Sequence, residues 1–491
     1  MRKDSEIEEM AKGTLGRLLF KYSWPALLAM SLNALYAVID RAFIGHGCGV
    51  DAMAGVQLAM PVMMLLVSFG PLIGVGHSAV LSIKLGEGDK TTCEKLVGQT
   101  VALKIALYAV LIPLIYLNLD RVLAWCGADQ VTAEAYEAAR TYLQIILASH
   151  IFSHLAFGLS ALQRAEGGAI RSMLCMVVGF GVNIVLDPLL IFGTPSFSIL
   201  NFSFSIPSLG VAGAAWATNI AMALSCLWAF GYYWRGKTAV RLRLRRVWIY
   251  PRLFVRAVSI GLAPFLQQLM SAVIVASLQL AFTKWIPDEA ARTAEIASLG
   301  VFSAALILII MPVLGCQQGL QPILGYNWGA RRYRRVLDAF KLGFWTTSVL
   351  TFVAFVIQVV PPFPTWIARL FVDSQESALI ALSARDLQLS NCMIWCISIN
   401  ITATTYFQAI GRPWMAVALS MLRQGVVMLP IIWFLPHFLD DKPFAIWLCM
   451  PVSDVICNVV TILPVMLHLR FLSRVRSREE RAEKPEEVML I

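Results

Sequence analysis

The chain is 491 residues long, 58% of them hydrophobic and only 14% charged, whereas a soluble domain carries about 25% charged residues. Residues 52–83, 188–234 and 296–330 contain no Asp, Glu, Lys or Arg. Because a membrane span needs about 20 apolar residues, these runs exclude a soluble globular protein. The net charge of +10 resides mostly in loops between apolar runs, which predicts membrane lipids as partners and no nucleic acid.

Apolar runs separated by polar or charged loops predict twelve transmembrane helices. The polar segment 1–16 precedes the first helix, and residues 473–491 form a charged tail that we expect to be disordered. In chain order, the predicted helices cover residues 17–43, 52–80, 92–118, 134–160, 171–194, 210–234, 252–284, 295–322, 336–360, 383–408, 414–439 and 443–472.

The charge of the loops alternates along the chain. Residues 235–256 hold eight basic and no acidic side chains, and four arginines crowd positions 331–335, whereas residues 120–137 carry four acids and one base. Basic loops stay on the cytoplasmic side. A twelve-helix chain therefore places both termini and the basic linker 235–251 in the cytoplasm, and we expect a multi-pass protein of the cell membrane.

The two halves of the chain resemble each other. Gly86 follows the second predicted helix and Gly329 the eighth, an offset of 329 − 86 = 243 positions. Gly167 and Gly411 follow the fourth and tenth helices, an offset of 411 − 167 = 244 positions. The expected fold is all-α, with two pseudo-symmetric six-helix lobes around a central cavity. The lobes span residues 17–234 and 252–472.

Several stretches resemble the multidrug and toxic compound extrusion (MATE) family, in its subgroup of bacterial multidrug exporters. They read PALLAMSLNALYAVIDRAFIGH from Pro25, GHSAVLSIKLGEGD from Gly76, VNIVLDPLLIFG from Val182 and GCQQGLQPILGYNWGARRYRRV from Gly315. The resemblance implies a secondary active antiporter, not an enzyme. Such a protein exports cationic amphiphilic drugs or metabolites in exchange for H⁺ or Na⁺, needs no other cofactor and is expected to work as a monomer. A flippase for a lipid-linked molecule, or an exporter of an endogenous metabolite on the same fold, is the alternative.

Placing an ionisable side chain inside a membrane costs about 2.5–3.5 kcal/mol on insertion scales, so each such residue is a candidate for a functional role. Asp40 lies in the first predicted helix, with Tyr36 four residues earlier on the same face. Asp187 lies in the fifth helix, with Asn183 at the same spacing, and Thr218 lies in the sixth. Carboxylate, amide and hydroxyl oxygens suit Na⁺, and the carboxylates also suit a proton.

The family resemblance implies that these side chains form an ion-coupling site in the N-terminal lobe. The residues that match the motifs of the family at this site are Asp40, Asn183, Asp187 and Thr218. They are also the possible Na⁺ ligands. Two structural alternatives stay open. Asp40 pairs with Arg41 at a helix end, or Asp187 caps the turn before the following proline.

The C-terminal lobe departs from family members that use a further acid in the seventh or tenth helix. The seventh helix offers Gln267 and Gln268 instead. The tenth is expected to offer only neutral polar groups, such as Asn391 and Asn400. This departure predicts that ion coupling resides in the N-terminal lobe.

Asp454, in the last predicted helix, is a candidate for substrate contact, because a desolvated carboxylate attracts a lipophilic cation. The alternative is an ion pair with Arg423 of the eleventh helix, in which the two charges neutralise each other. The predicted substrate-binding residues are Asp454, Gln267, Gln268, Arg423 and Trp216.

His150 and His154 have the spacing of metal ligands on a helix, but the sequence places no third ligand near them. A polar contact between helices is the expected role. The ten cysteines show no metal-ligand spacing and are expected to be small core residues. An intramembrane enzyme is not predicted, since the chain has no HExxH motif or paired catalytic residues on neighbouring helices.

Overall fold

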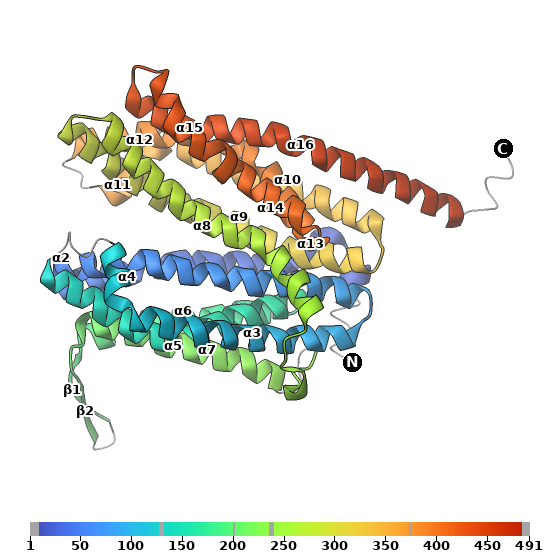
Figure 1. The fold of residues 1–491 in the computed structure, drawn as a ribbon, viewed down its shortest axis with the longest axis horizontal. Helices are drawn as coiled ribbons and strands as arrows, with labels where there is room; N and C mark the ends of the chain where they lie inside the picture. The colour runs from blue at the N-terminus through green and yellow to red at the C-terminus, as the bar shows by residue number, and fades with distance from the viewer. Residues whose placement is uncertain (1–8, 127–131, 200–201, 235–239, 373–375, 484–491) are drawn as a thin grey trace. The chain divides into compact units, whose positions relative to one another are not determined.

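The computed structural model describes residues 9–126, 132–199, 202–234, 240–372 and 376–483, apart from some side chains within these ranges. Most of these residues are helical, as the sequence predicts (Figure 1). The elements are α2 (Leu15–Gly86), α3 (Lys90–Leu117), α4 (Leu119–Trp125), α5 (Ala133–Ala165), α6 (Ala169–Ile191), β1 (Thr194–Ile199), β2 (Phe202–Ile206), α7 (Gly210–Trp234), η2 (Leu244–Arg246), α8 (Pro251–Trp285), α9 (Glu289–Gly329), α10 (Tyr333–Val359), α11 (Phe363–Phe371), α12 (Ser377–Asn391), η3 (Ile394–Ile397), α13 (Ser398–Ala409), α14 (Pro413–Met421), η4 (Leu422–Met428), α15 (Leu429–Phe434), η5 (Leu435–His437) and α16 (Lys442–Glu483).

Helix α2 contains 72 residues and would measure about 108 Å if it were straight, far more than a hydrocarbon core of ~30 Å. Both of its ends nevertheless meet α9. Ser23 lies against Gly319, and Ile83 lies against Gly329. These two glycines are only about 15 Å apart along α9. Helix α2 therefore doubles back, and its two limbs are the first two predicted spans.

Ten helices among the described residues are long and apolar enough to cross a membrane. The two remaining predicted spans take other forms. One is the N-terminal limb of α2. The other, 383–408, is divided among α12, η3 and α13, none of which reaches 18 residues by itself. Counted in this way, the predicted twelve-helix fold is confirmed.

The chain between α6 and α7 forms an antiparallel hairpin, which adds two strands to the predicted all-α fold. Strands β1 and β2 pair Phe197 with Phe204 and Ile199 with Phe202. In Figure 1 the hairpin projects away from the ends of α6 and α7. Serine alternates with apolar residues in both strands, and this period of two is the sequence signal of a strand.

Helix α16 extends through Glu483, so residues 473–483 are helical and the expectation of a wholly disordered tail is wrong. Residues 484–491 lie outside the described residues. Two short helices, α4 and α11, also lie between predicted helices, in segments for which the sequence predicts loops.

The structure forms two compact units. The first unit contains Leu28–Leu81 and Asp89–Gly261. The second contains residues 9–27 of the described chain, Ser82–Gly88 and the chain from Leu262 onward. The boundaries fall inside α2 and α8. The predicted lobes, which divide the chain at the linker, stay a prediction.

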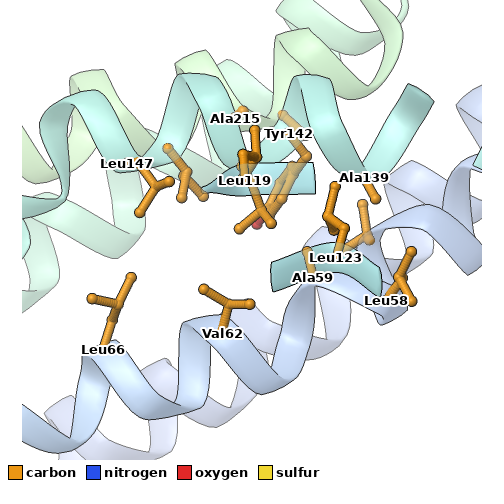
Figure 2. Close-up of a cluster of buried hydrophobic side chains, with 14 of the residues drawn as sticks. Leu58, Ala59, Val62, Leu66, Leu119, Leu123, Ala139, Tyr142, Leu147 and Ala215 are labelled. Carbon is orange, nitrogen blue, oxygen red and sulfur yellow. The ribbon is translucent and has the colours of Figure 1, made fainter. Parts of the chain in front are cut away.

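Leucine, valine and alanine side chains fill the core of the first unit between α2, α4, α5 and α7 (Figure 2). Helix α7 packs against both α5 and α6. A Cβ atom at Gly213 of α7 would overlap the backbone of Leu190 of α6. A glycine at this crossing therefore brings the two helices together, as small residues do between membrane helices.

The basic linker has a structural role in the first unit besides its charge. Arg243 and Arg246 form ion pairs with Glu94 of α3, at 3.0 and 2.5 Å. Gln99 of the same helix donates to the carbonyl of Tyr250 at 3.2 Å. These contacts hold the described end of the linker against α3.

In the second unit, Trp447 of α16 is fully buried between Phe282 of α8 and Phe302 of α9. At another place in this unit, Arg335 of α10 donates to the carbonyl of Gly13 at 2.7 Å. The N-terminal segment before α2 is therefore held by one of the arginines that follow α9.

Candidate functional site

A cluster of oxygen-bearing side chains lies inside the first unit, where α2, α6 and α7 meet. Helix α2 supplies Tyr36 and Asp40, α6 supplies Asn183 and Asp187, and α7 supplies Thr218. Asn183 and Asp187 are fully buried. The structure therefore brings together the five residues that the sequence predicted for ion coupling.

The amide of Asn183 is the centre of this cluster. Its nitrogen donates to Oδ1 of Asp187 at 3.0 Å and to the hydroxyl of Thr218 at 3.2 Å. Thr218 also shares a hydrogen bond with Tyr36. The ring of Tyr36 stacks on Phe180 with the ring centroids 5.4 Å apart. Sequence reasoning missed Phe180, although it lies one turn before Asn183 on the same helix.

Asp187 and Asp40 are neighbours in this cluster, close enough for their carboxyl groups to act on each other. Two ionised carboxylates repel each other in an interior with little water, and this repulsion favours a proton on one of the two groups. Among the described residues, no basic side chain forms an ion pair with Asp187. The pair can therefore hold one proton in an interior with little water.

The orientation of the Asn183 amide bears on whether the cluster could hold a sodium ion. The nitrogen of the Asn183 amide is directed at Asp187 and Thr218, and its oxygen accepts from no donor among the described residues. A cation at the centre of the cluster would need that oxygen in place of the nitrogen. Coordination of Na⁺ would thus require the amide of Asn183 to rotate, so that its oxygen takes the place of its nitrogen.

The two alternative roles for these acids have different outcomes. Asp187 lies within α6, which runs on through Pro188 to Ile191, so it does not cap a helix end. The side chain of Arg41 lies outside the described residues. A pairing of Asp40 with Arg41 therefore stays open.

Two of the predicted substrate-binding residues form an ion pair in the second unit. Nε of Arg423, in the π-helical segment η4, lies 2.7 Å from Oδ1 of Asp454 on α16. The side chain of Asp454 is 4% exposed and that of Arg423 is 28% exposed. Ser453 also donates to the carbonyl of Arg423 at 3.1 Å. The pairing alternative is what the structure shows, and substrate contact by Asp454 stays a prediction.

The other predicted substrate-binding residues are not joined to this pair. Gln267 of α8 is half-buried and Gln268 is exposed. Among the described residues, neither forms a hydrogen bond or ion pair with Arg423 or Asp454. Trp216 of α7 belongs to the first unit and is 49% exposed. Their role in binding stays a prediction.

A second pair of buried acids lies in the second unit, and the sequence reading missed it. Asp386 of α12 and Glu295 of α9 are neighbouring acids, and both are buried. Asp386 accepts from Ser298 at 2.6 Å, and Glu295 accepts from Trp447 at 2.8 Å. The expectation that the tenth predicted helix offers only neutral polar groups is therefore wrong. Asp386 lies three residues after its predicted start, where it was visible in the sequence.

The model of the family described as MatE matches residues 25–189 and 268–434, which together make up most of the chain. The chain belongs to the MatE family. The matched segments include four of the five residues of the oxygen cluster, and Thr218 lies between them.

The MatE assignment agrees with similar proteins. The multidrug export protein MepA of Staphylococcus aureus (strain MRSA252) is 23% identical over 95% of this chain and 96% of its own length. A crystal structure of a MATE protein in complex with MaL6 superposes with a TM-score of 0.85 at 21% identity, covering 95% of this chain and 99% of that one. An outward-facing multidrug resistance MATE transporter gives 0.83 at 21% identity, with 95% and 98% covered. The fold is thus that of the MATE transporters.

Proposed function

We propose that this MatE protein is an exporter of cationic amphiphilic small molecules that is driven by protons entering through Asp40 and Asp187. The observation that carries the proposal is that Asp187 is fully buried beside a second acid, Asp40, and hydrogen-bonded to Asn183, with no base paired to Asp187 among the described residues. Asp187 can therefore gain or lose a proton without breaking an ion pair of its own. A buried acid paired to an arginine cannot do so at a comparable energy.

The mechanism follows from the change of charge. With one proton the pair carries a single negative charge, and with two protons it is neutral. Release of a proton leaves two negative charges side by side in an interior with little water, where like charges repel strongly. The ionisation state therefore biases the packing of α2 against α6 and α7. Antiport requires only that the proton and the substrate favour opposite conformations of the protein.

The cargo is inferred from two sources. Several similar proteins are named as multidrug export proteins, and a buried carboxyl cluster with a nearby aromatic ring suits a cation with an apolar body. Asp454 adds less support than its sequence suggested, because Arg423 already neutralises it. Export of an endogenous metabolite, or flipping of a lipid-linked one, is the competing function of the same fold.

We further propose that the protein works as a monomer in the cell membrane, with both termini in the cytoplasm and its basic loops against anionic lipids. The alternation of loop charge supports this orientation. A reporter fused after Glu483, active only in the cytoplasm, should be active. Activity of an external reporter at that position would contradict the orientation.

The deciding experiment measures ethidium efflux in vesicles, with a pH gradient or a Na⁺ gradient as the only driving force. We expect the pH gradient to drive efflux in the wild type, and Asp187→Asn and Asp40→Asn each to reduce it by more than about tenfold. Asp120→Asn is the matched control, because Asp120 is an exposed acid that pairs with Arg140 outside the cluster. Efflux driven by Na⁺ alone, or wild-type efflux in both cluster variants, would refute the proposal.

A panel of substrates separates the competing cargoes. Cationic dyes should be exported, and neutral dyes of similar size should not, because only a cation gains from the carboxyl cluster. Transport of a lipid-linked saccharide with no transport of any dye would favour the flippase.

A further inference from the structure

Aromatic and cationic side chains gather where three membrane-length helical segments of the second unit end. These segments are Pro251–Trp285, Pro413–His437 and Lys442–Arg470. The rings of Trp285 and His437 meet edge to face, with their centroids 4.6 Å apart and an interplanar angle of 78°. The ends of apolar spans lie at the level of the lipid headgroups. The mechanism proposed above uses none of these side chains.

Two ammonium groups lie over the indole ring of Trp285. Nζ of Lys284 is 5.3 Å from the centroid of this ring, and Nζ of Lys442 is 5.5 Å from it. Nζ of Lys284 is also 5.5 Å from the ring centroid of Trp433. These are the distances of cation–π contacts, in which the ring attracts the cation without neutralising it. Two positive charges are therefore held beside one aromatic surface.

No acid neutralises these two charges. Among the described residues, neither Lys284 nor Lys442 forms an ion pair. Asp288 and Asp441, which are close to them in the sequence, each accept from a backbone N–H in the first turn of the helix that follows. Asp440 is exposed and shares no hydrogen bond with either lysine in the described part of the chain. Positive charges without a counter-charge attract an anion.

Unused N–H donors accompany the charges. An ammonium group has three N–H bonds. Lys442 uses two of them on the carbonyl oxygens of Pro436 and Leu439, both at 2.9 Å, and so holds the turn between η5 and α16. The third donor of Lys442 and all three donors of Lys284 have no acceptor among the described residues. Charge and donors together favour an anion with several acceptor oxygens, and a phosphate group is of this kind.

The surroundings of the two lysines favour a phospholipid over free phosphate. Phe434 follows Trp433 in the chain and is 64% exposed, and Phe438 follows His437 and is 81% exposed. Large apolar side chains gain nothing from a free phosphate ion, whereas the acyl chains of a lipid cover them. Tryptophan rings at the end of a span are also typical of the interface between membrane and water.

We propose that Lys284, Lys442, Trp285 and Trp433 form a binding site for an anionic phospholipid. Lys284 donates to the phosphate oxygens, Lys442 adds a second positive charge, and the two indole rings carry the glycerol part of the headgroup. The acyl chains lie along the two exposed phenylalanines. The binding site needs no assumption about transport, and only its assignment to the outer leaflet rests on the orientation proposed above.

Native mass spectrometry of the full-length protein in detergent measures the binding, in titrations with phosphatidylglycerol and with the zwitterionic phosphatidylcholine. We expect phosphatidylglycerol to bind more tightly. Lys284→Gln should weaken its binding by about fivefold, the effect of one lysine beside an anionic lipid. Lys341→Gln is the matched control, because it removes the same charge from an exposed lysine of α10 and should leave the affinity unchanged.

A second measurement locates the site. Phosphatidylglycerol with a photoactivatable group in an acyl chain should cross-link to residues 433–442 of the wild type, and much less to those of Lys284→Gln. An excess of inorganic phosphate should not prevent this cross-link. Lys284→Arg keeps the charge and should keep the binding. Comparison of the two variants, each with a cooperative melting curve, separates loss of the charge from loss of the fold.

Equal affinity for the two lipids, unchanged affinity for phosphatidylglycerol in Lys284→Gln, or cross-links confined to other parts of the chain would overturn the inference. Displacement of the lipid by inorganic phosphate would also overturn it, because the site would then take a free anion. These outcomes are independent of transport. If Asp40→Asn and Asp187→Asn keep their efflux while Lys284→Gln loses the lipid, the proposed function fails and the lipid site stands.

Discussion

Each unit buries an aspartate that the sequence marked, and the two aspartates have opposite surroundings. Asp187 of the first unit lies beside another acid, Asp40, and accepts from Asn183. Asp454 of the second unit lies 2.7 Å from an arginine. Protonation of the first carboxyl group breaks no ion pair among the described residues, whereas protonation of the second would break its ion pair with Arg423. Whether a buried acid in a membrane helix is a candidate for ion coupling thus depends on which side chain lies beside it.

Glu295 and Asp386 show that an acid pair is not confined to the first unit. They form an acid pair in the second unit, as Asp40 and Asp187 do in the first. Each of them also accepts from a neutral donor, Trp447 or Ser298.

The largest effect is expected for the acid pair of the first unit. Asp40→Asn and Asp187→Asn should each reduce proton-driven efflux by more than about tenfold, which corresponds to 1.4 kcal/mol or more of lost coupling. The double variant should lose no more than either single one, because the two groups share one proton. Additive losses in initial efflux rates would show that the two acids act separately.

The next effect concerns stability. Arg423→Met leaves Asp454 charged and buried without its partner, and we expect a loss of about 3–5 kcal/mol. Asp454→Asn combined with Arg423→Met should recover most of it. Thermal unfolding in detergent measures both. The exposed pair of Arg140 and Asp120 is the control, where the equivalent loss is about 0–1 kcal/mol. Equal losses at both sites would contradict the contrast between a buried and an exposed pair.

A smaller loss is expected where α6 and α7 are held together. Gly213→Ala places a methyl group against the backbone of Leu190, and overpacking of this kind costs about 1–3 kcal/mol. Gly181→Ala of α6 is the matched control, because a Cβ atom there meets nothing within 4 Å. Melting temperatures check both variants. If Gly213→Ala also lowers efflux, the distance between Asp187 and Thr218 matters for coupling.

The smallest effect on transport is expected for the acid pair of the second unit. Asp386→Asn and Glu295→Gln keep the shape of each side chain, and we expect proton-driven efflux to persist in both. Vesicle efflux under a pH gradient is the measurement. A loss as large as that of Asp187→Asn would move part of the coupling into the second unit.

The sequence by itself determined the class of protein, the twelve spans and the candidate acids. Helices of this length follow from local apolar content, since no segment can leave its backbone unpaired in lipid. The pairing of Asn183 with Asp187 was readable because residues four apart share a helix face. The alternating serines of β1 and β2 are a sequence signal for the hairpin too. They lie within a long uncharged run whose apolar content predicts membrane helices.

Only the tertiary structure decided which side chains from different helices meet. The partner of Asp454, the contact between Asp40 and Asp187, and the pairing of Glu295 with Asp386 depend on how helices rotate and cross. The same holds for the rings of Tyr108 and His154, which come from α3 and α5. Periodicity fixes the face on which a residue lies. Close packing along the whole length of two helices decides which of their faces meet. A single sequence does not contain this information in a readable form.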